Sequence, residues 1–168
     1  MRGVAQRNVA ELSRVHGIGP AKAAQIKAAI EFGRRLVATS GEERYRIRSP
    51  QDVFNYLVLD LRDEKREHFV SLLMDTKNGV LHRHTVSIGD LSSSIVHPRE
   101  VFAEAIRRSA SSLIVAHNHP SGDPSPSPED IAVTRRLCEA GELLGISILD
   151  HVILGDNRFV SLKEKGYM

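Results

Sequence analysis

The apolar run SSLIVA, residues 111–116, constrains the fold of this chain more than any other short segment. It is too short for an ordinary helix and ends at a loop rich in proline, glycine and serine, which is typical of a buried strand. A helical pattern then runs from Pro128 to about Leu144. A buried strand that leads through a loop into a helix predicts an α/β domain with helices packed on a sheet.

The same hydrophobic pattern predicts the order of the other elements in this domain. Asn78-Gly79 separates two strand patterns and suits a hairpin turn in which both residues have positive φ. The predicted order of helices and strands is αββαβαββ, which indicates a mixed α/β sandwich built on one sheet. The remaining predicted elements are a helix opened by Pro50, strands at residues 68–75 and 80–88, a helix opened by Pro98, and strands at residues 146–154 and 157–162.

Composition narrows the class of protein. The chain has 168 residues and one cysteine, it has no apolar run near the ~20 residues that span a bilayer, and its start lacks the pattern of a secretion signal. We therefore expect a cytoplasmic protein without membrane segments. Cys138 alone forms neither an internal disulfide nor a metal site of several thiolates, and its helical setting predicts a buried, unreactive thiol.

A basic segment precedes the main domain. Residues 1–48 hold 10 Lys and Arg against 4 Asp and Glu, whereas the rest of the chain holds 13 against 17. The hydrophobic spacing predicts a short helix over residues 9–15 and a longer one over residues 20–39. A polar connector follows, so we expect a helical segment at residues 1–42 and a second domain at residues 46–168.

The loop AHNHPSGDPSPSPED, residues 116–130, carries three side chains that can bind a metal. His117 and His119 alternate at the end of the predicted strand, so both side chains point to the same face. The loop between them and the next helix can bring Asp130, in the first turn of that helix, back toward the histidines. Two imidazoles and one carboxylate form a site of the catalytic zinc type, which leaves a fourth position for water.

Each half of this pattern also has an explanation that needs no metal. Ser127, Pro128 and Asp130 occupy the N-cap, N1 and N3 positions of a capping-box-like helix start. The two histidines could form a polar rim at the end of the strand. Their combination with the aspartate, at this spacing after a buried strand, favours the metal site.

The pattern HxH, ten residues and Asp, with an embedded SxxD, resembles the signature of the JAMM (MPN-plus) metalloprotease fold. The sequence HNHPSGD is similar to that of the RadC family of bacterial proteins. Further segments that resemble this family are EHFVSLLMDTKNGVL, SIGDLSSSIVHPREVFAEAI and LDHVILG. These segments are spread over residues 67–155. The resemblance implies a cytidine-deaminase-like α/β/α sandwich, the JAMM fold, preceded here by a small N-terminal helical hairpin.

The resemblance also implies roles for individual residues. Ser127 would donate a hydrogen bond to the oxyanion of a tetrahedral intermediate. The fold further requires an upstream glutamate that takes a proton from the attacking water and passes it to the leaving amine. Glu67, directly before the strand HFVSLLMD, is the first choice for this base, and Glu64 is the alternative. By the same resemblance the Zn²⁺ ligands are His117, His119 and Asp130.

Other polar residues of the main domain are less specific. His151 alternates with apolar residues in LDHVIL, so it either supports a metal ligand through a hydrogen bond or is structural. Asn118 is expected to point away from its flanking histidines, toward structural hydrogen bonds. His97 is expected at the cap of the helix that follows it, whereas His82 and His84 are expected to be exposed.

The segment VHGIGPAK, residues 15–22, resembles the hairpin of helix-hairpin-helix DNA-binding units. Gly17 and Gly19 would let backbone N–H groups approach a phosphate, and Lys22 and Lys27 would supply positive charge. Such contacts bind the DNA backbone without reading its sequence. The alternative is a plain helical hairpin that packs on the main domain or mediates protein contacts.

Three functions are compatible with these features. The first is a zinc hydrolase that cleaves a peptide or isopeptide amide of an unknown peptide or protein substrate. The second is a DNA-associated repair or recombination factor that acts through the hairpin, with a metal site of secondary importance. The third is an inactive, metal-stabilised scaffold. A complete ligand set with a general base favours the first, because a scaffold requires neither an open coordination position nor a base.

Overall fold

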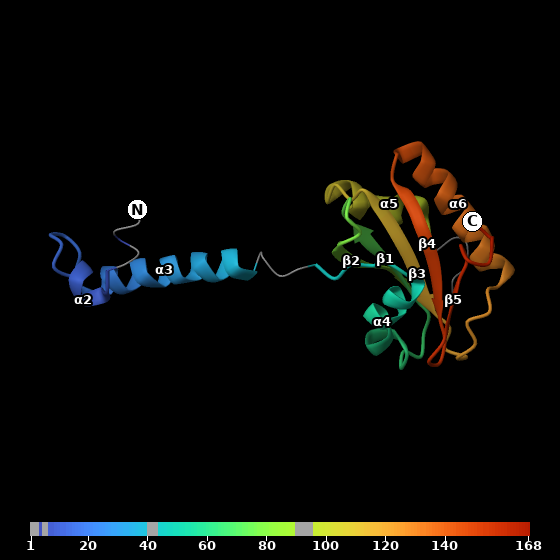
Figure 1. Ribbon diagram of the computed structural model, residues 1–168, viewed down its shortest axis with the longest axis horizontal. Coiled ribbons are helices and arrows are strands. Elements are labelled where there is room, and N and C mark those ends of the chain that lie inside the picture. The colour runs from blue at the N-terminus through green and yellow to red at the C-terminus, as the bar shows by residue number, and fades with distance from the viewer. Residues whose placement is uncertain (1–3, 5–6, 40–43, 90–95) are drawn as a thin grey trace. The chain divides into compact units, whose positions relative to one another are not determined.

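The computed structural model describes residue 4 and residues 7–39, 44–89 and 96–168, with the side chains of 34–39 not described. The chain divides into two compact units, Met1–Glu43 and Arg44–Met168 (Figure 1). Among the described residues, no helix combines the length and the apolar character needed to cross a membrane.

The first unit contains two helices, α2 (Val9–Leu12) and α3 (Pro20–Thr39). A capping box between Asn8 and Glu11 begins α2. The predicted helix over residues 9–15 is wrong at its C-terminal end, because the backbone turns tightly after Leu12 and the N–H of Val15 bonds to the carbonyl of Leu12. Leu12 is buried, whereas Val9 and Val15 are largely exposed.

The second unit is built on one five-stranded sheet with the strand order β2-β1-β3-β4-β5. Strands β3 and β4 pair in parallel, and the other three neighbouring pairs are antiparallel. The order of elements along the chain confirms the predicted αββαβαββ pattern. The strands are β1 (His68–Met74), β2 (Val80–Ile88), β3 (Ser112–Asn118), β4 (Ser147–Leu154) and β5 (Phe159–Ser161).

Helices cover both faces of this sheet (Figure 1). Helix α4 (Pro50–Leu61) packs on one face through a core that includes Leu57 and Val70. Helices α5 (Pro98–Arg107) and α6 (Pro128–Leu144) pack on the other face, in a core that includes Phe102 and Leu137. The predicted α/β/α sandwich is therefore confirmed.

The burial of strand β3 explains why residues 113–116, LIVA, are all apolar. Strand β3 is buried along its whole length, so its successive side chains enter the cores on the two faces of the sheet in turn. Ile114 and Ala116 face α4, whereas Leu113 and Val115 face α5 and α6. The same alternation places His117 on the α6 face, at the end of the strand.

The hairpin turn between β1 and β2 differs from the prediction. Asn78 has the expected positive φ of 58°, but Gly79 does not have one. Asp75 closes the turn instead, because its Oδ1 accepts hydrogen bonds from the N–H groups of Lys77 and Gly79. A Cβ on Gly79 would lie 2.8 Å from Oδ2 of Asp75. Glycine is needed here for close approach to that carboxylate.

The predicted polar connector is packed in its second half, while residues 40–43 lie outside the described residues. The N–H of Val80 donates to the carbonyl of Tyr45 over 2.9 Å, and the N–H of Ile47 donates to the carbonyl of Asn78 over 3.0 Å. Ile47 is buried in the α4 core. The expectation for Cys138 also needs correction, because its side chain is only half-buried.

Candidate metal centre

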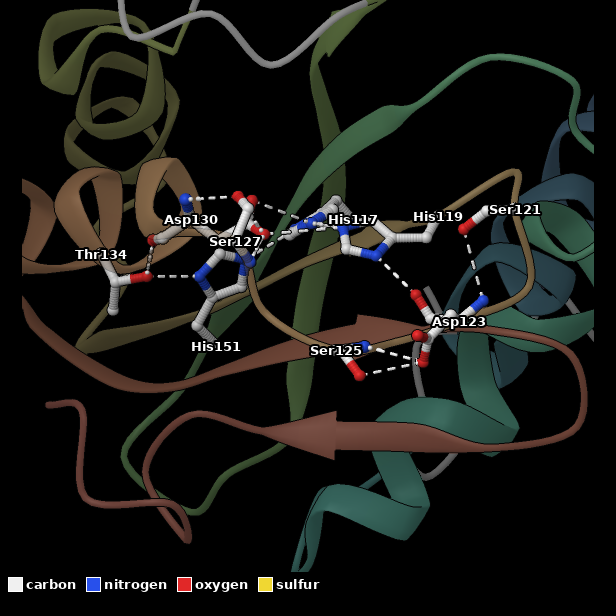
Figure 2. A network of polar contacts seen from close by, with 9 residues as sticks. All are labelled: His117, His119, Ser121, Asp123, Ser125, Ser127, Asp130, Thr134 and His151. Carbon is white, nitrogen blue, oxygen red and sulfur yellow. Dashed lines mark hydrogen bonds and ion pairs between the residues drawn. The ribbon is translucent and has the colours of Figure 1, made fainter.

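The candidate site lies where β3 ends and α6 begins. His117 is the last residue but one of β3, and His119 follows as the chain leaves the sheet. The loop then returns to Pro128, so that Asp130 stands in the first turn of α6. Figure 2 shows the three side chains directed toward one another, as the sequence predicted.

The nitrogen and oxygen atoms of the three side chains converge on a small volume. The Nε2 atoms of His117 and His119 are 3.0 Å apart. Asp130 Oδ1 lies 3.2 Å from Nε2 of His117, and Asp130 Oδ2 lies 3.5 Å from Nε2 of His119. Among the described residues, these three form the group of histidine and carboxylate side chains close enough to share one metal ion.

These separations fit the donor set of a small divalent cation. Ligand atoms held ~2.0–2.1 Å from a tetrahedral zinc lie about 3.3 Å from one another. The separation of the two Nε2 atoms is 3.0 Å, and the nitrogen–oxygen separations, each to a different oxygen of Asp130, are 3.2 and 3.5 Å, all near that value. The residues present therefore fit zinc, although the donor set alone does not distinguish zinc from other divalent metals that accept imidazole and carboxylate.

The capping box at the start of α6 joins Ser127 to Asp130, which is also the third proposed metal ligand. Its hydroxyl accepts a hydrogen bond from the backbone N–H of Asp130, and its own backbone N–H donates to Oδ2 of Asp130 over 2.8 Å. The hydroxyl also donates to Oδ2 over 2.8 Å. The capping box thus holds the carboxylate against the histidines, so the two interpretations of this motif coexist.

The loop holds His119 through a backbone carbonyl. Nδ1 of His119 lies 2.7 Å from the carbonyl oxygen of Asp123 (Figure 2). The loop is packed closely on the turn after β4, because a Cβ on Gly155 would lie 2.4 Å from the carbonyl oxygen of Gly122. The N–H of Asp156 donates to that same carbonyl. The β4–β5 turn therefore fixes the loop that orients His119.

Side chains hold His117. Its Nδ1 lies 2.8 Å from Nε2 of His151, and Nδ1 of His151 lies 2.5 Å from the hydroxyl of Thr134. His117, His151 and Thr134 are each 0% exposed. His151 is thus placed behind the proposed ligand. Thr134 was not expected from sequence: its position four residues after Asp130 predicts a bond within α6, but gives no sign of a contact with β4.

The surroundings change the acidities of the group. Although burial raises the pKa of the Asp130 carboxyl, the imidazoles of His117 and His119 hold that pKa far below its usual range. The hydrogen bond to Asp130 raises the pKa of His119, as does the carbonyl of Asp123. Burial lowers the pKa of His151 well below its usual value, so this ring is neutral.

The two candidate bases point to different places. The hydrogen bond to Asp130 is the main cause of the raised pKa of His119, and the negative charge of Glu67 contributes to it as well. The carboxylate of Glu64 instead lies 3.3 Å from Nε2 of His68. His68 and Phe69 are neighbours in β1, so their side chains point to opposite faces of the sheet. Phe69 is the residue that pairs with His117. The contact with His68 therefore directs Glu64 away from the face of His117, which favours Glu67.

Asn118 ties the segment before β1 to the strand that carries His117. Its Oδ1 accepts from the N–H of His68 over 2.8 Å, and its Nδ2 donates to the carbonyls of Arg66, over 3.1 Å, and Glu64, over 3.4 Å. The side chain is almost fully buried. The expectation that it makes structural hydrogen bonds is confirmed, and these bonds also position Glu67.

The other histidines lie outside this centre. His97 caps α5, since its Nδ1 accepts from the N–H of Arg99, as predicted. His82 and His84 are half-buried on β2, so the prediction that they are exposed is wrong. Burial lowers the pKa of His82, and Arg108 and Glu104 of the α5 region act on it as well.

The hairpin of the first unit has one left-handed glycine. Gly17 has φ of +82°, while Gly19 has no such requirement, and a Cβ on either residue would meet nothing within 4 Å. Lys22 is exposed and its Nζ lies 3.4 Å from the carbonyl oxygen of Gly17. Lys27 is half-buried in α3. The motif residues therefore lie close together on an open turn.

Comparison with known proteins identifies the family. The family model described as RadC-like JAB domain matches residues 47–167. A UPF0758 protein of Desulforamulus reducens is 60% identical over 166 residues, which cover 99% of this chain and 73% of the relative. A UPF0758 protein of Bacillus licheniformis is 58% identical over 168 residues, 100% of this chain and 75% of the relative. With its α/β/α sandwich and its converging histidines and aspartate, this chain belongs to the RadC-like JAB domain family.

Proposed function

We propose that this chain is a zinc-dependent hydrolase of the JAMM type, which cleaves a peptide or isopeptide amide with an activated water. The observation that carries the proposal is the convergence of His117, His119 and Asp130. Nδ1 of His119 faces a carbonyl, which only accepts, so in the neutral ring the proton is on Nδ1 and Nε2 carries a lone pair. A lone pair that lies among an imidazole and a carboxylate calls for a cation.

The number of ligands supports a catalytic site over a structural one. Structural zinc sites are closed by four protein ligands, whereas catalytic sites use three and leave one position for water or substrate. The group here has three members. Zinc held by them would supply Lewis acidity, which activates water as a nucleophile and polarises a carbonyl beside it.

Glu67 is proposed as the general base and acid. It takes a proton from the attacking water and returns it to the leaving amine as the amide C–N bond breaks, so that the products are a carboxylate and an amine. A hollow of about 370 Å³ beside Glu67 is lined by Lys65, Arg66, Gly89 and Pro120. Pro120 directly follows His119 in the sequence, so the hollow is bordered by the proposed base and by the residue next to a proposed ligand.

Ser127 is proposed as the donor to the oxyanion that forms on the substrate carbonyl. In this structure its hydroxyl proton is directed to Oδ2 of Asp130. The role therefore requires the hydroxyl to rotate toward the substrate. Asp130 would keep the hydrogen bond from the backbone N–H of Ser127, which is independent of that rotation.

Metal content and a search for cleaved substrates test this proposal together. The purified protein should contain about one zinc per chain, and incubation with a library of linear and isopeptide-linked peptides should yield new amines. Glu67→Gln should keep the metal and lose cleavage by ~100-fold or more. Glu64→Gln is the matched control and should cleave normally. Absence of any tightly bound divalent metal contradicts the proposal, and metal without cleavage of any substrate supports the scaffold.

The hairpin supports a second candidate function, binding to the DNA backbone. Gly17 has the left-handed conformation that an exposed turn of this kind uses, and Lys22 is exposed beside it. Open backbone N–H groups near a helix start suit a phosphate. This function is independent of the metal centre, so DNA binding that survives removal of metal would distinguish it from the hydrolase activity.

A further inference from the structure

We infer that Thr134 and His151 are positioning residues which fix the His117 ring in the tautomer that can bind a metal. The inference deepens the proposed function, because it rests on His117 acting as a ligand. An imidazole binds a metal through a nitrogen that carries no proton, so the other nitrogen must hold the proton. Three consecutive contacts in the structure decide where that proton lies.

The first contact fixes the hydroxyl of Thr134. Its Oγ1 lies 2.6 Å from the backbone carbonyl oxygen of Asp130. A carbonyl oxygen only accepts hydrogen bonds, and two oxygens at this distance repel unless a proton lies between them. The single hydroxyl proton of Thr134 is therefore directed to Asp130. The hydroxyl then offers only lone pairs to its other neighbour.

The second contact fixes the tautomer of His151. Its Nδ1 lies 2.5 Å from Oγ1 of Thr134, which has no proton left to donate in that direction. Nδ1 of His151 must therefore carry the proton and donate it. In the neutral ring the opposite nitrogen, Nε2, is then an acceptor.

The third contact transfers this constraint to His117. Its Nδ1 lies 2.8 Å from Nε2 of His151, so Nδ1 of His117 must donate. In the neutral ring Nε2 of His117 then carries a lone pair, and this is the atom that faces Nε2 of His119 and Oδ1 of Asp130 (Figure 2). A proton on Nδ1 of His151 thus leaves the metal-facing nitrogen of His117 unprotonated.

Burial makes this relay decisive. All three side chains are 0% exposed, so water does not offer an alternative donor or acceptor. Phe69 lies against both rings, with ring centroids 6.0 Å from His117 and 5.4 Å from His151. The relay also begins at Asp130, whose carboxylate is the third proposed ligand, so one residue supplies a ligand and sets the tautomer of another.

The test compares Thr134→Val with Thr134→Ser. Valine keeps the shape of the side chain but removes the hydroxyl, so Nδ1 of His151 loses its acceptor and the proton moves to Nε2 of both rings. The expected result is a zinc affinity 10–100-fold weaker than that of the wild type, measured by competition with a chromophoric chelator. Thr134→Ser keeps the hydroxyl and should bind zinc close to the wild-type level.

A second readout needs no metal and no activity. Long-range ¹H–¹⁵N NMR of the metal-free protein reports which ring nitrogen carries the proton. His117 and His151 should both carry it on Nδ1 in the wild type and in Thr134→Ser, and both should lose this preference in Thr134→Val. Wild-type rings protonated on Nε2, or unchanged zinc affinity in a folded Thr134→Val, would overturn the inference.

His151 variants keep the inference falsifiable if Thr134→Val does not fold. His151→Gln retains a carbonyl oxygen that can accept from His117, whereas His151→Leu retains none. The glutamine variant should bind zinc more tightly than the leucine variant, and equal affinities would overturn the relay. If the wild type itself binds no zinc, the proposed function fails, while the NMR tautomers still decide the relay.

Discussion

The N-terminal hairpin and the metal centre are both short motifs that the sequence singled out, yet their surroundings differ. Around the hairpin the described contacts are local: Lys22 reaches the carbonyl of Gly17, and a Cβ on Gly19 would meet nothing within 4 Å. At the metal centre His117 contacts His151, 34 positions away in sequence, and Asn118 contacts His68, 50 positions away.

This difference teaches what a motif needs to become a specific site. Buried polar groups must find partners, because an unpaired one costs about 1–3 kcal/mol. The metal centre satisfies that requirement with residues from β1, β3, β4 and α6, which fixes each donor in direction. Exposed residues of the hairpin can exchange their partners for water, so their geometry is less strictly determined.

The largest expected effect separates the metal centre from the rest of the second unit. His117→Ala should reduce bound zinc from about one per chain to almost none, because a three-ligand site loses a ligand. His84→Ala is the matched control: it also belongs to an HxH pair, but among the residues that the structure describes no third ligand completes a site there. Elemental analysis after dialysis measures both. Equal loss of zinc in the two variants would mean that the metal is not held at His117.

An intermediate effect is expected from the buried link between β3 and the segment of Glu67. Asn118→Ala leaves the N–H of His68 and two carbonyls without this partner, and should lower the free energy of unfolding by about 1–3 kcal/mol. Asn55→Ala, an exposed position on α4, should change it by less than about 0.5 kcal/mol. Urea denaturation followed by circular dichroism gives both values, and similar small changes would refute the structural link.

The smallest effect is expected at the hairpin. If residues around Gly17 contact phosphates, Lys22→Glu should weaken duplex DNA binding and reduce the slope of log affinity against log salt by about 1. Lys77→Glu, which is exposed on the turn between β1 and β2, makes the same charge change elsewhere. Fluorescence anisotropy at several salt concentrations compares them. The same slope in both variants would argue against a hairpin-specific contact.

Much of the metal centre could be predicted because its residues are close in sequence. Strand alternation placed His117 and His119 on one side, and the serine-proline start of α6 predicted where Asp130 would lie. Thr134 could not be found in this way, because its contact with His151 joins α6 to β4 across the core. The choice of Glu67 over Glu64 as the base stays a prediction.

Local errors in the prediction have a common origin. Gly79 suggested a left-handed turn, but its importance comes from the nearby carboxylate of Asp75. Val15 continued a helical spacing, but the chain turned after Leu12. His82 and His84 were predicted to be exposed, but they are half-buried because α5 packs beside β2. Each error concerns a contact that the hydrophobic pattern alone does not reveal.

The sequence by itself determined the order of helices and strands, the family resemblance and the three side chains able to hold a metal. Hydrophobic periodicity and capping residues act over a few positions, so they can be read along the chain. Only the tertiary structure decided how these side chains are oriented. Their direction depends on hydrogen bonds between Asp130, Thr134, His151 and His117, which exist only when α6 packs on β3 and β4 and excludes water.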